Sequence, residues 1–409
     1  MPQPDMLDPR ILGQRIAEAR RARGKTQEEV AEFLGCSRPT YIAIEKGERL
    51  AKTDEIIRLA PFFGKKVNDL VRPTEPVVDL QPHLRAVAEK MKGTDEATLQ
   101  AAIAELQQLA EDYRDLERMM NAPLRFNHPP EVTLDSRIDA AQLAESVAVQ
   151  ERRRLGLGDQ PIIDLRRTLE WDVGLRIFYS DKLPSAIAGM YAYTADLGCC
   201  ILINRKHPPE RRRASLLHEY GHLHLSADRY RPGIDYLSAG GRKPANERFA
   251  EAFALGFLMP TSSVQQRFHD IVTTTGDFQV RDLRHLSHFY FVSVEAMARR
   301  LEELALIPKG SWQFLKEAKF APKQAAELLG LQPLSLNDDL YPERYMYLAV
   351  HAYERGEIGD SDLAYYLRCD VATAREIVAR ALISRELEAT GEEGHLRLDF
   401  NRSLLSGAS

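Results

Sequence analysis

One short stretch decides the fold of the central part of this chain: Ser215-Leu216-Leu217-His218-Glu219-Tyr220-Gly221-His222-Leu223-His224. Its leucines predict a helix with one apolar side. His218 and His222 stand four residues apart, so a helix places both imidazoles one turn apart on the same face. That spacing lets two imidazole nitrogens bind one Zn²⁺ at about 2.0–2.1 Å. The stretch therefore predicts a metal-binding helix.

Glu219 follows the first histidine and can lean over the open side of such a metal. There it would accept a proton from the bound water and later return the proton to the leaving amine. Zinc lowers the pKa of its bound water to about 7 and polarises a scissile carbonyl. The pattern therefore predicts a zinc-dependent peptidase with Glu219 as catalytic acid and base. The alternative is an ordinary helix that happens to carry two unrelated histidines.

A catalytic zinc site needs a third protein ligand beside its open position. The following helix, predicted over 244–258, carries Glu247 and Glu251 on one face beside an apolar stripe. Because buried carboxylates need partners, one glutamate can bind the metal while the other orients a ligating imidazole. The alternative is that both glutamates are ordinary charged residues on the solvated face of the helix. His224 is a rival ligand, but it points away from the face that His218 and His222 share.

The surrounding sequence predicts an α+β domain over residues 138–310 with a small sheet. Runs of β-branched and aromatic residues predict strands at 173–179, 187–194 and 199–204. Apolar periodicity predicts helices at 138–155, 161–171, 209–226, 244–258 and 280–305. Residues 318–409 are predicted to form a helical C-terminal domain of unknown role. Within it, 356–381 has a helix-turn-helix rhythm, with an ordinary helical pair as the alternative.

Residues 8–72 predict an all-α domain of short helices. Thr26-Gln27-Glu28-Glu29 fits a capping box, and Gly35 ends the helix that this box begins. Ser37 then caps another helix, with Pro39 in its first turn, where a missing N–H costs little. The chain as a whole is therefore predicted to be multidomain and mainly α-helical.

Proline-rich segments separate these domains. Residues 73–94 predict a connector, and the linker region extends to residue 130 with a long amphipathic helix at 96–120. This helix either packs on its own domain or forms a dimer interface. The prolines of 73–82 and 121–130 mark accessible segments that a protease could cut.

Composition sets the remaining limits. The formal net charge is −5, but residues 1–72 hold 14 Lys/Arg against 11 Asp/Glu, a net of +3, so their charge permits DNA binding. Four cysteines without any C-x-x-C spacing argue against a disulfide framework and for a reducing cytoplasm. No stretch has the features of a signal peptide or a membrane span. We therefore expect a cytoplasmic protein without a membrane partner.

The combination of His218-Glu219-Tyr220-Gly221-His222 with Glu247-x-x-Ala250-x-x-Phe253-Ala254-x-x-Phe257-Leu258-Met259-Pro260 resembles the ImmA/IrrE family of metallopeptidases. That family has H-E-x-G-H followed by E-x-x-A-N-x-F-A-x-x-L-L-M-P. The resemblance covers about 140–310 and implies a zincin-like fold. It also implies that His218, His222 and Glu247 bind the metal and that Glu219 is catalytic. Glu251 stands where the family commonly has Asn. Two histidines and a carboxylate suit Mn²⁺ as well as Zn²⁺, and the helix motif favours zinc.

Residues 12–70 resemble XRE or lambda-repressor-like helix-turn-helix domains. The resemblance lies in Thr26 to Ala31, in Gly35-Cys36-Ser37 and in Tyr41-Ile42-x-Ile44-Glu45-x-Gly47. It implies that the helix after Ser37 enters the major groove of double-stranded DNA. Its expected DNA-contacting residues are Gln27, Ser37, Arg38, Thr40, Tyr41 and Lys46. Arg38 is the candidate for guanine, because a guanidinium can bind O6 and N7 together. Such domains bind as dimers; the alternative is a fold kept for protein contacts.

Together these resemblances imply a DNA-binding transcriptional regulator with a zinc metalloendopeptidase domain. Members of the peptidase family cleave XRE-type repressors in stress or mobile-element responses. The expected substrate is such a repressor, a partner subunit or the protein itself. The alternative is a transcription factor whose metallopeptidase-like domain senses a ligand or metal with little proteolysis. The intact Glu219 argues against this alternative, because a sensor needs ligands but no general base.

Overall fold

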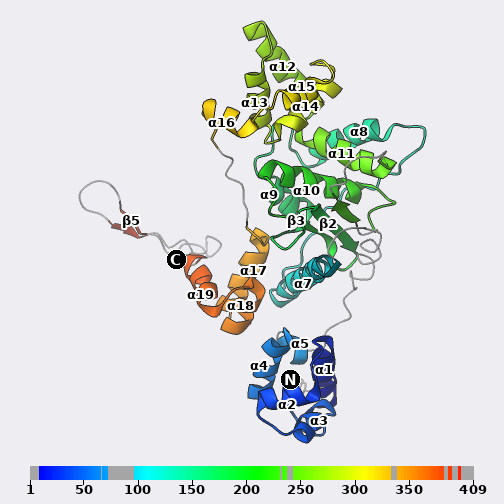
Figure 1. The fold of residues 1–409 in the computed structure, drawn as a ribbon. Helices are drawn as coiled ribbons and strands as arrows, with labels where there is room; N and C mark the ends of the chain where they lie inside the picture. Colours follow the sequence, from blue (N-terminus) through cyan, green and yellow to red (C-terminus); the bar gives the residue numbers. More distant parts are fainter. Residues whose placement is uncertain are drawn as a thin grey trace. The chain divides into compact units, whose positions relative to one another are not determined.

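The computed structural model describes residues 9–65, 67–71, 96–230, 233–236, 243–332, 339–381, 386–388 and 395–397. Figure 1 follows the elements along the chain. The chain divides into two compact units, Met1–Val77 with Ala349–Ser409, and Val78–Leu348. The predicted connector at 73–94 lies outside the described residues.

Within residues 9–71, as far as they are described, five short helices surround one apolar core. These are α1 (Pro9–Ala22), α2 (Gln27–Leu34), α3 (Arg38–Glu45), α4 (Thr53–Phe63) and α5 (Val67–Val71). The predicted capping box is confirmed: Thr26 accepts from the backbone of Glu29, whose carboxylate accepts in return. The predicted cap at Ser37 is confirmed as well. Gly13 lets α1 lie directly on α3, since a Cβ there would meet Ile44 O at 2.3 Å.

A four-stranded sheet forms the centre of the larger unit, in the order β1-β3-β2-β4. The strands are β1 (Arg176–Ser180), β2 (Ile187–Thr194), β3 (Gly198–Asn204) and β4 (Gly233–Tyr236). β1 runs parallel to β3, and the other pairs are antiparallel. The three predicted strands are thus confirmed. β4 was not predicted, because four residues starting with glycine give no periodic signal.

Helices cover the two faces of this sheet. α10 (Pro209–His224) packs on β2 and β3, and α11 (Ala245–Leu258) lies between α10 and α8 (Ala140–Arg154). The predicted stretch 161–171 forms α9 (Leu165–Thr168), followed by a π-helical turn, η1 (Leu169–Val173). The opposite face of β1 and β3 is covered by α7 (Glu96–Met119). The expected α+β arrangement within a mainly helical chain is therefore confirmed.

The structure answers the question that the amphipathic helix at 96–120 left open. Its apolar residues, including Ile103, Leu106 and Ala110, are buried against its own unit. Tyr113 packs edge-on against Phe178 of β1. This apolar face is therefore occupied within one chain, so it does not provide the dimer interface that the sequence suggested.

A helical layer follows the sheet: α12 (Thr261–Thr275), α13 (Val280–Phe289), α14 (Val294–Glu303), α15 (Ser311–Glu317) and α16 (Pro322–Leu328). The predicted helix at 280–305 is two helices. Phe291 adopts a positive φ of 56° between them, and Ser293 caps the second. α12 was not predicted.

The C-terminal part differs from the predicted domain 318–409. Residues up to Leu348 belong to the larger unit, so the division falls inside α17 (Glu343–Glu354). α18 (Asp360–Leu367) and α19 (Val371–Ala381) form the expected helical pair. A hairpin of β5 (Glu386–Glu388) and β6 (His395–Arg397) was not predicted. No helix within the described ranges has both the length and the apolar character needed to cross a bilayer.

Candidate metal centre

Two adjacent helices carry the candidate ligands, and a glycine sets their separation. Gly221 of α10 faces Ala250 of α11, where an added Cβ would lie 3.0 Å from Ala250 Cα. Ordinary carbon contacts are about 3.5–4.0 Å, so any side chain at this position would push the helices apart. The glycine of the His-Glu-x-Gly-His pattern thus allows a carboxylate on α11 to reach the histidines of α10.

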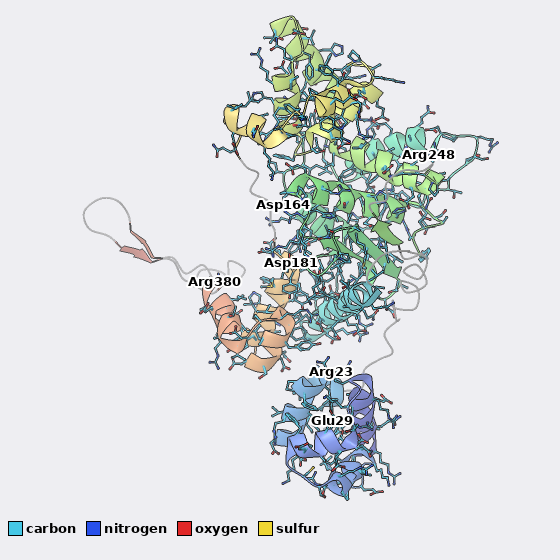
Figure 2. All side chains as sticks on the ribbon, in the orientation of Figure 1. Arg23, Glu29, Asp164, Asp181, Arg248 and Arg380 are labelled. Atoms are coloured by element: carbon cyan, nitrogen blue, oxygen red, sulfur yellow. The ribbon has the colours of Figure 1, made fainter. Side chains whose placement is uncertain are left out.

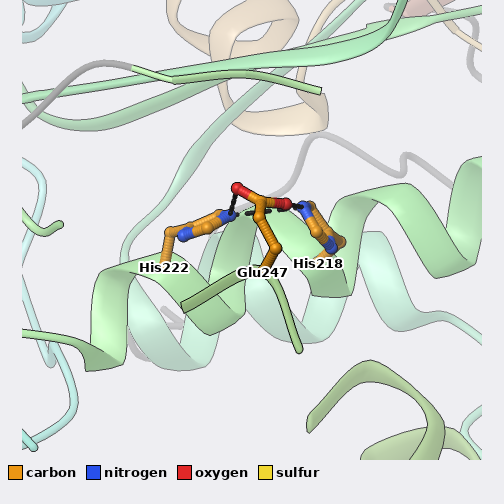
Figure 3. Close-up of side chains that lie close together, drawn as sticks. All are labelled: His218, His222 and Glu247. Atoms are coloured by element: carbon orange, nitrogen blue, oxygen red, sulfur yellow. Dashed lines mark hydrogen bonds and ion pairs between the residues drawn. The ribbon is translucent and has the colours of Figure 1, made fainter. Parts of the chain in front are cut away.

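His218, His222 and Glu247 converge at this contact (Figure 3). His218 Nε2 lies 3.2 Å from His222 Nε2 and 3.3 Å from Glu247 Oε2. His222 Nε2 lies 3.6 Å from Glu247 Oε1. The two histidines are buried, and the glutamate is partly exposed. Three metal-binding atoms thus face one point.

These separations fit a tetrahedral metal ion. Atoms bound to one zinc at about 2.0–2.1 Å and tetrahedral angles lie about 3.3 Å apart. The separations of 3.2, 3.3 and 3.6 Å differ from this value by only a few tenths of an ångström. The hydrogen bond from His218 lowers the pKa of Glu247, which favours the carboxylate form that a metal needs. The three residues could therefore hold zinc with one position left open.

Glu219 lies between the metal-binding helix and the sheet. It is 1% exposed. β2 makes room for it with Gly189, where a Cβ would approach Glu219 Oε1 to 3.2 Å. Its carboxylate is therefore shielded from water between α10 and β2, one residue after His218 in the sequence.

Asp228, which the sequence analysis did not identify, supports one of the imidazoles. Its Oδ2 lies 2.8 Å from His222 Nδ1. Glu251, expected in such a role, instead pairs with Lys243 on the partly exposed side of α11. A carboxylate six residues after the second histidine, in the turn that ends the helix, was the sequence signal for Asp228.

His224 does not join the candidate ligands. Its ring is buried, and it packs against Tyr220 and Phe253 with centroid distances of 5.0 and 4.6 Å. Burial lowers the pKa of His224 to about 3, with a further contribution from nearby arginines, so this imidazole stays neutral. It is a core residue.

The expected DNA-contacting residues divide into two groups. Arg38 and Lys46 present exposed side chains at the two ends of α3. Tyr41, by contrast, is 0% exposed and belongs to the helical core, so it cannot reach a base. It is buried because α3 turns this face toward the other helices, as its spacing from Ile44 would have indicated.

The remaining three expected contacts are engaged within the domain. Ser37 and Thr40 bond to each other at the start of α3, with 2.7 Å between their hydroxyl oxygens. Gln27 Nε2 donates to Glu45 Oε2 at 2.8 Å, and Glu45 in turn accepts from Arg20. Figure 2 shows Glu29 of α2 on the same small domain. Of the residues expected to contact DNA, the two cationic ones, Arg38 and Lys46, therefore have exposed side chains that DNA could reach.

Comparisons with known proteins match two separate domains of this chain. Residues 16–70 match a helix-turn-helix family, and residues 172–302 match the IrrE N-terminal-like domain of a peptidase family. The cryptic phage CTXphi transcriptional repressor RstR of Vibrio cholerae is 35% identical over 69 residues, which are 17% of this chain and 62% of that protein. The chain thus covers less than two thirds of that relative.

An HTH-type transcriptional regulator of Methanocaldococcus jannaschii is 47% identical over 45 residues, 11% of this chain and 68% of that protein. Among solved structures, ComR from Streptococcus suis aligns with 92% of this chain and 89% of its own at 11% identity. Its TM-score of 0.16 is too low to support an argument. This chain therefore belongs to the helix-turn-helix transcriptional regulators and joins that domain to an IrrE-type domain of a metallopeptidase family.

Proposed function

We propose that this protein is a DNA-binding regulator whose second domain is a zinc-dependent endopeptidase that cleaves a regulatory protein. The convergence of His218, His222 and Glu247 on one point is the observation that carries this proposal, and Glu219 follows His218 on the same helix. A regulator that only bound DNA would need none of these four residues together. The substrate we propose is an XRE-type repressor, a partner subunit or the chain itself.

In the proposed reaction, the metal ligands and Glu219 have different roles in peptide hydrolysis. Bound zinc would polarise the peptide carbonyl and lower the pKa of a coordinated water. Glu219 would accept the proton of the attacking water and then deliver it to the leaving nitrogen. The two histidines and Glu247 would hold the zinc ion, and the peptide would approach from the side on which Glu247 is partly exposed.

The structure bears on where self-cleavage could occur. The segment 121–130 is pinned to the larger unit, because Asn127 N donates to Val173 O at 3.0 Å and Asn127 Nδ2 to Asp172 O at 2.8 Å. Arg229 also donates to Pro129 O at 2.6 Å. A protease needs an extended, released chain, so we do not favour this segment as the cut site. The other candidate, 73–82, lies outside the described residues.

The test compares the full chain with its Glu219→Gln variant, both loaded with zinc and with or without DNA. Intact-mass measurement would follow cleavage of the chain itself and of XRE-type repressors from the same source. General acid–base catalysis contributes about 10²–10⁴-fold, so we expect the variant to keep zinc and lose at least about 100-fold in rate. If both proteins hold zinc and neither cleaves anything, the peptidase proposal fails and the sensor alternative replaces it.

The proposal includes a homodimer on DNA, in keeping with the helix-turn-helix family. Since α7 buries its apolar face within one chain, the interface would have to use another surface. Sedimentation analysis with and without operator DNA would test this part. A single chain bound per operator would contradict it.

A further inference from the structure

Asp228 contacts both helices that carry the candidate ligands. Its Oδ2 lies 2.8 Å from His222 Nδ1 of α10 and accepts a hydrogen bond of 3.0 Å from Asn246 Nδ2 of α11. Asn246 immediately precedes Glu247 in the sequence. One carboxylate oxygen therefore joins an imidazole ligand on one helix to the neighbour of the carboxylate ligand on the other.

This contact determines which nitrogen of His222 carries its proton. A carboxylate oxygen accepts hydrogen bonds, so the proton of the neutral ring lies on Nδ1. The lone pair then lies on Nε2, the atom that faces His218 and Glu247. Asp228 itself is on the Nδ1 side of the ring, which excludes it as a fourth ligand of the same ion.

The turn that presents Asp228 is held firmly. Asp228 N donates to Leu225 O at 3.1 Å, and Arg229 N donates to the same oxygen at 2.8 Å. The Arg229 side chain is buried and donates to Leu223 O at 2.8 Å. Tyr191 of β2 donates to Arg229 O at 2.7 Å. Asp228 is thus anchored to both the metal helix and the sheet, so its carboxylate has little freedom to follow a displaced imidazole.

The hydrogen bond between Asp228 and His222 is largely buried, which increases the effect of losing it. The Asp228 and His222 side chains are only 15% and 11% exposed. A hydrogen bond with little access to water is electrostatically stronger than an exposed one, and losing it costs more. Partners that orient metal-bound imidazoles change metal affinity by about 10–100-fold when they are removed.

We propose that Asp228 is a positioning residue that holds His222 in its metal-binding tautomer and ties α11, with Glu247, to the same point through Asn246. This inference rests on the proposed metallopeptidase function. It adds that the two ligand helices are coupled through one carboxylate oxygen. The side chains of Asp228 and Asn246 therefore act as one unit.

The test measures Zn²⁺ and Co²⁺ affinity of the full chain by competition with a chelator, for Asp228→Ala, Asn246→Ala and the double variant. Glu251→Gln is the matched control, because it removes a carboxylate from α11 that pairs with Lys243. We expect about a 10–100-fold loss for Asp228→Ala, a smaller loss for Asn246→Ala and none for the control. The double variant should lose no more than Asp228→Ala alone, since coupled residues are not additive.

A second readout requires no metal. In the metal-free chain, ¹⁵N NMR of His222, assigned with a His222→Gln variant, should show the Nδ1–H tautomer. In Asp228→Ala, which removes the acceptor oxygen, the ring should shift toward a mixture of tautomers, which a purely structural role of Asp228 would not produce. If Asp228→Ala does not fold, Asn246→Ala and its effect on affinity carry the test.

The outcomes separate the two proposals. A wild-type chain that binds neither ion overturns the proposed function and this inference with it. A wild-type chain that binds zinc, together with an Asp228→Ala variant of equal affinity and unchanged tautomer, overturns only the role of Asp228. An equal loss in Glu251→Gln would also overturn it, because any carboxylate near the site would then have the same effect.

Discussion

Replacing Gly221 by alanine tests how closely the two ligand helices must approach. On an isolated helix the change would be favourable, because alanine is better than glycine by about 1 kcal/mol. In this structure the new Cβ would lie 3.0 Å from Ala250 Cα and 3.3 Å from Ala250 Cβ. Ala250 Cα is a backbone atom, so no side-chain rotation can relieve this contact. α10 and α11 must therefore move apart.

The size of the shift follows from these distances. Carbon atoms rest at about 3.5–4.0 Å, so the helices must separate by at least about 0.5 Å. Metal–ligand distances tolerate only about 0.2 Å. Glu247, now 3.3 Å from His218 Nε2, would lie beyond that tolerance. If zinc draws the separated helices back together, the overpacking cost of about 1–3 kcal/mol falls on the zinc-bound state and corresponds to a loss of metal affinity of about 5–150-fold.

The assay is zinc affinity by chelator competition together with thermal unfolding of the metal-free protein. Gly221→Ala should bind zinc more weakly, while its unfolding temperature changes little. The double variant Gly221→Ala with Ala250→Gly should recover part of the affinity, because it removes the 3.3 Å contact but leaves the 3.0 Å one. A single variant that is more stable than wild type and binds zinc equally well would refute the reasoning.

Three further outcomes follow from close contacts and exposure. Gly13→Ala would place a Cβ 2.3 Å from Ile44 O, so DNA affinity in a gel-shift assay should fall while zinc content stays unchanged. Equal DNA affinity would contradict the packing of α1 on α3. Gly189→Val would push on Glu219, and we expect about a 10–100-fold loss of cleavage with zinc retained, measured by mass spectrometry. Arg38→Ala should cost about 1–3 kcal/mol of base discrimination at one position, and selection from random DNA should show that position flattened; an unchanged consensus would argue against base contact.

The sequence predicted elements best where local patterns are strong. The three strands with β-branched and aromatic runs were expected within a few residues of their observed ends, and the caps at Thr26 and Ser37 were expected correctly. The short strand β4 and the break around Phe291 depend on tertiary pairing and on one positive φ. The face of α7 that resembled a dimer interface is covered by β1 and β3. Periodicity shows that an apolar face must be covered but does not identify its partner.

The same difference between local sequence patterns and tertiary contacts explains which residues of the candidate site could be predicted. His218 and His222 face one way because helical spacing requires it, so a local pattern was sufficient to find them. The role of Asp228 depends on the turn after α10, where its carboxylate meets a ligand and the start of α11. Glu251 shares a helical face with Glu247, yet its carboxylate pairs with Lys243 instead. Spacing along one helix can therefore identify ligands, whereas the groups that orient them come from a different segment and require the fold.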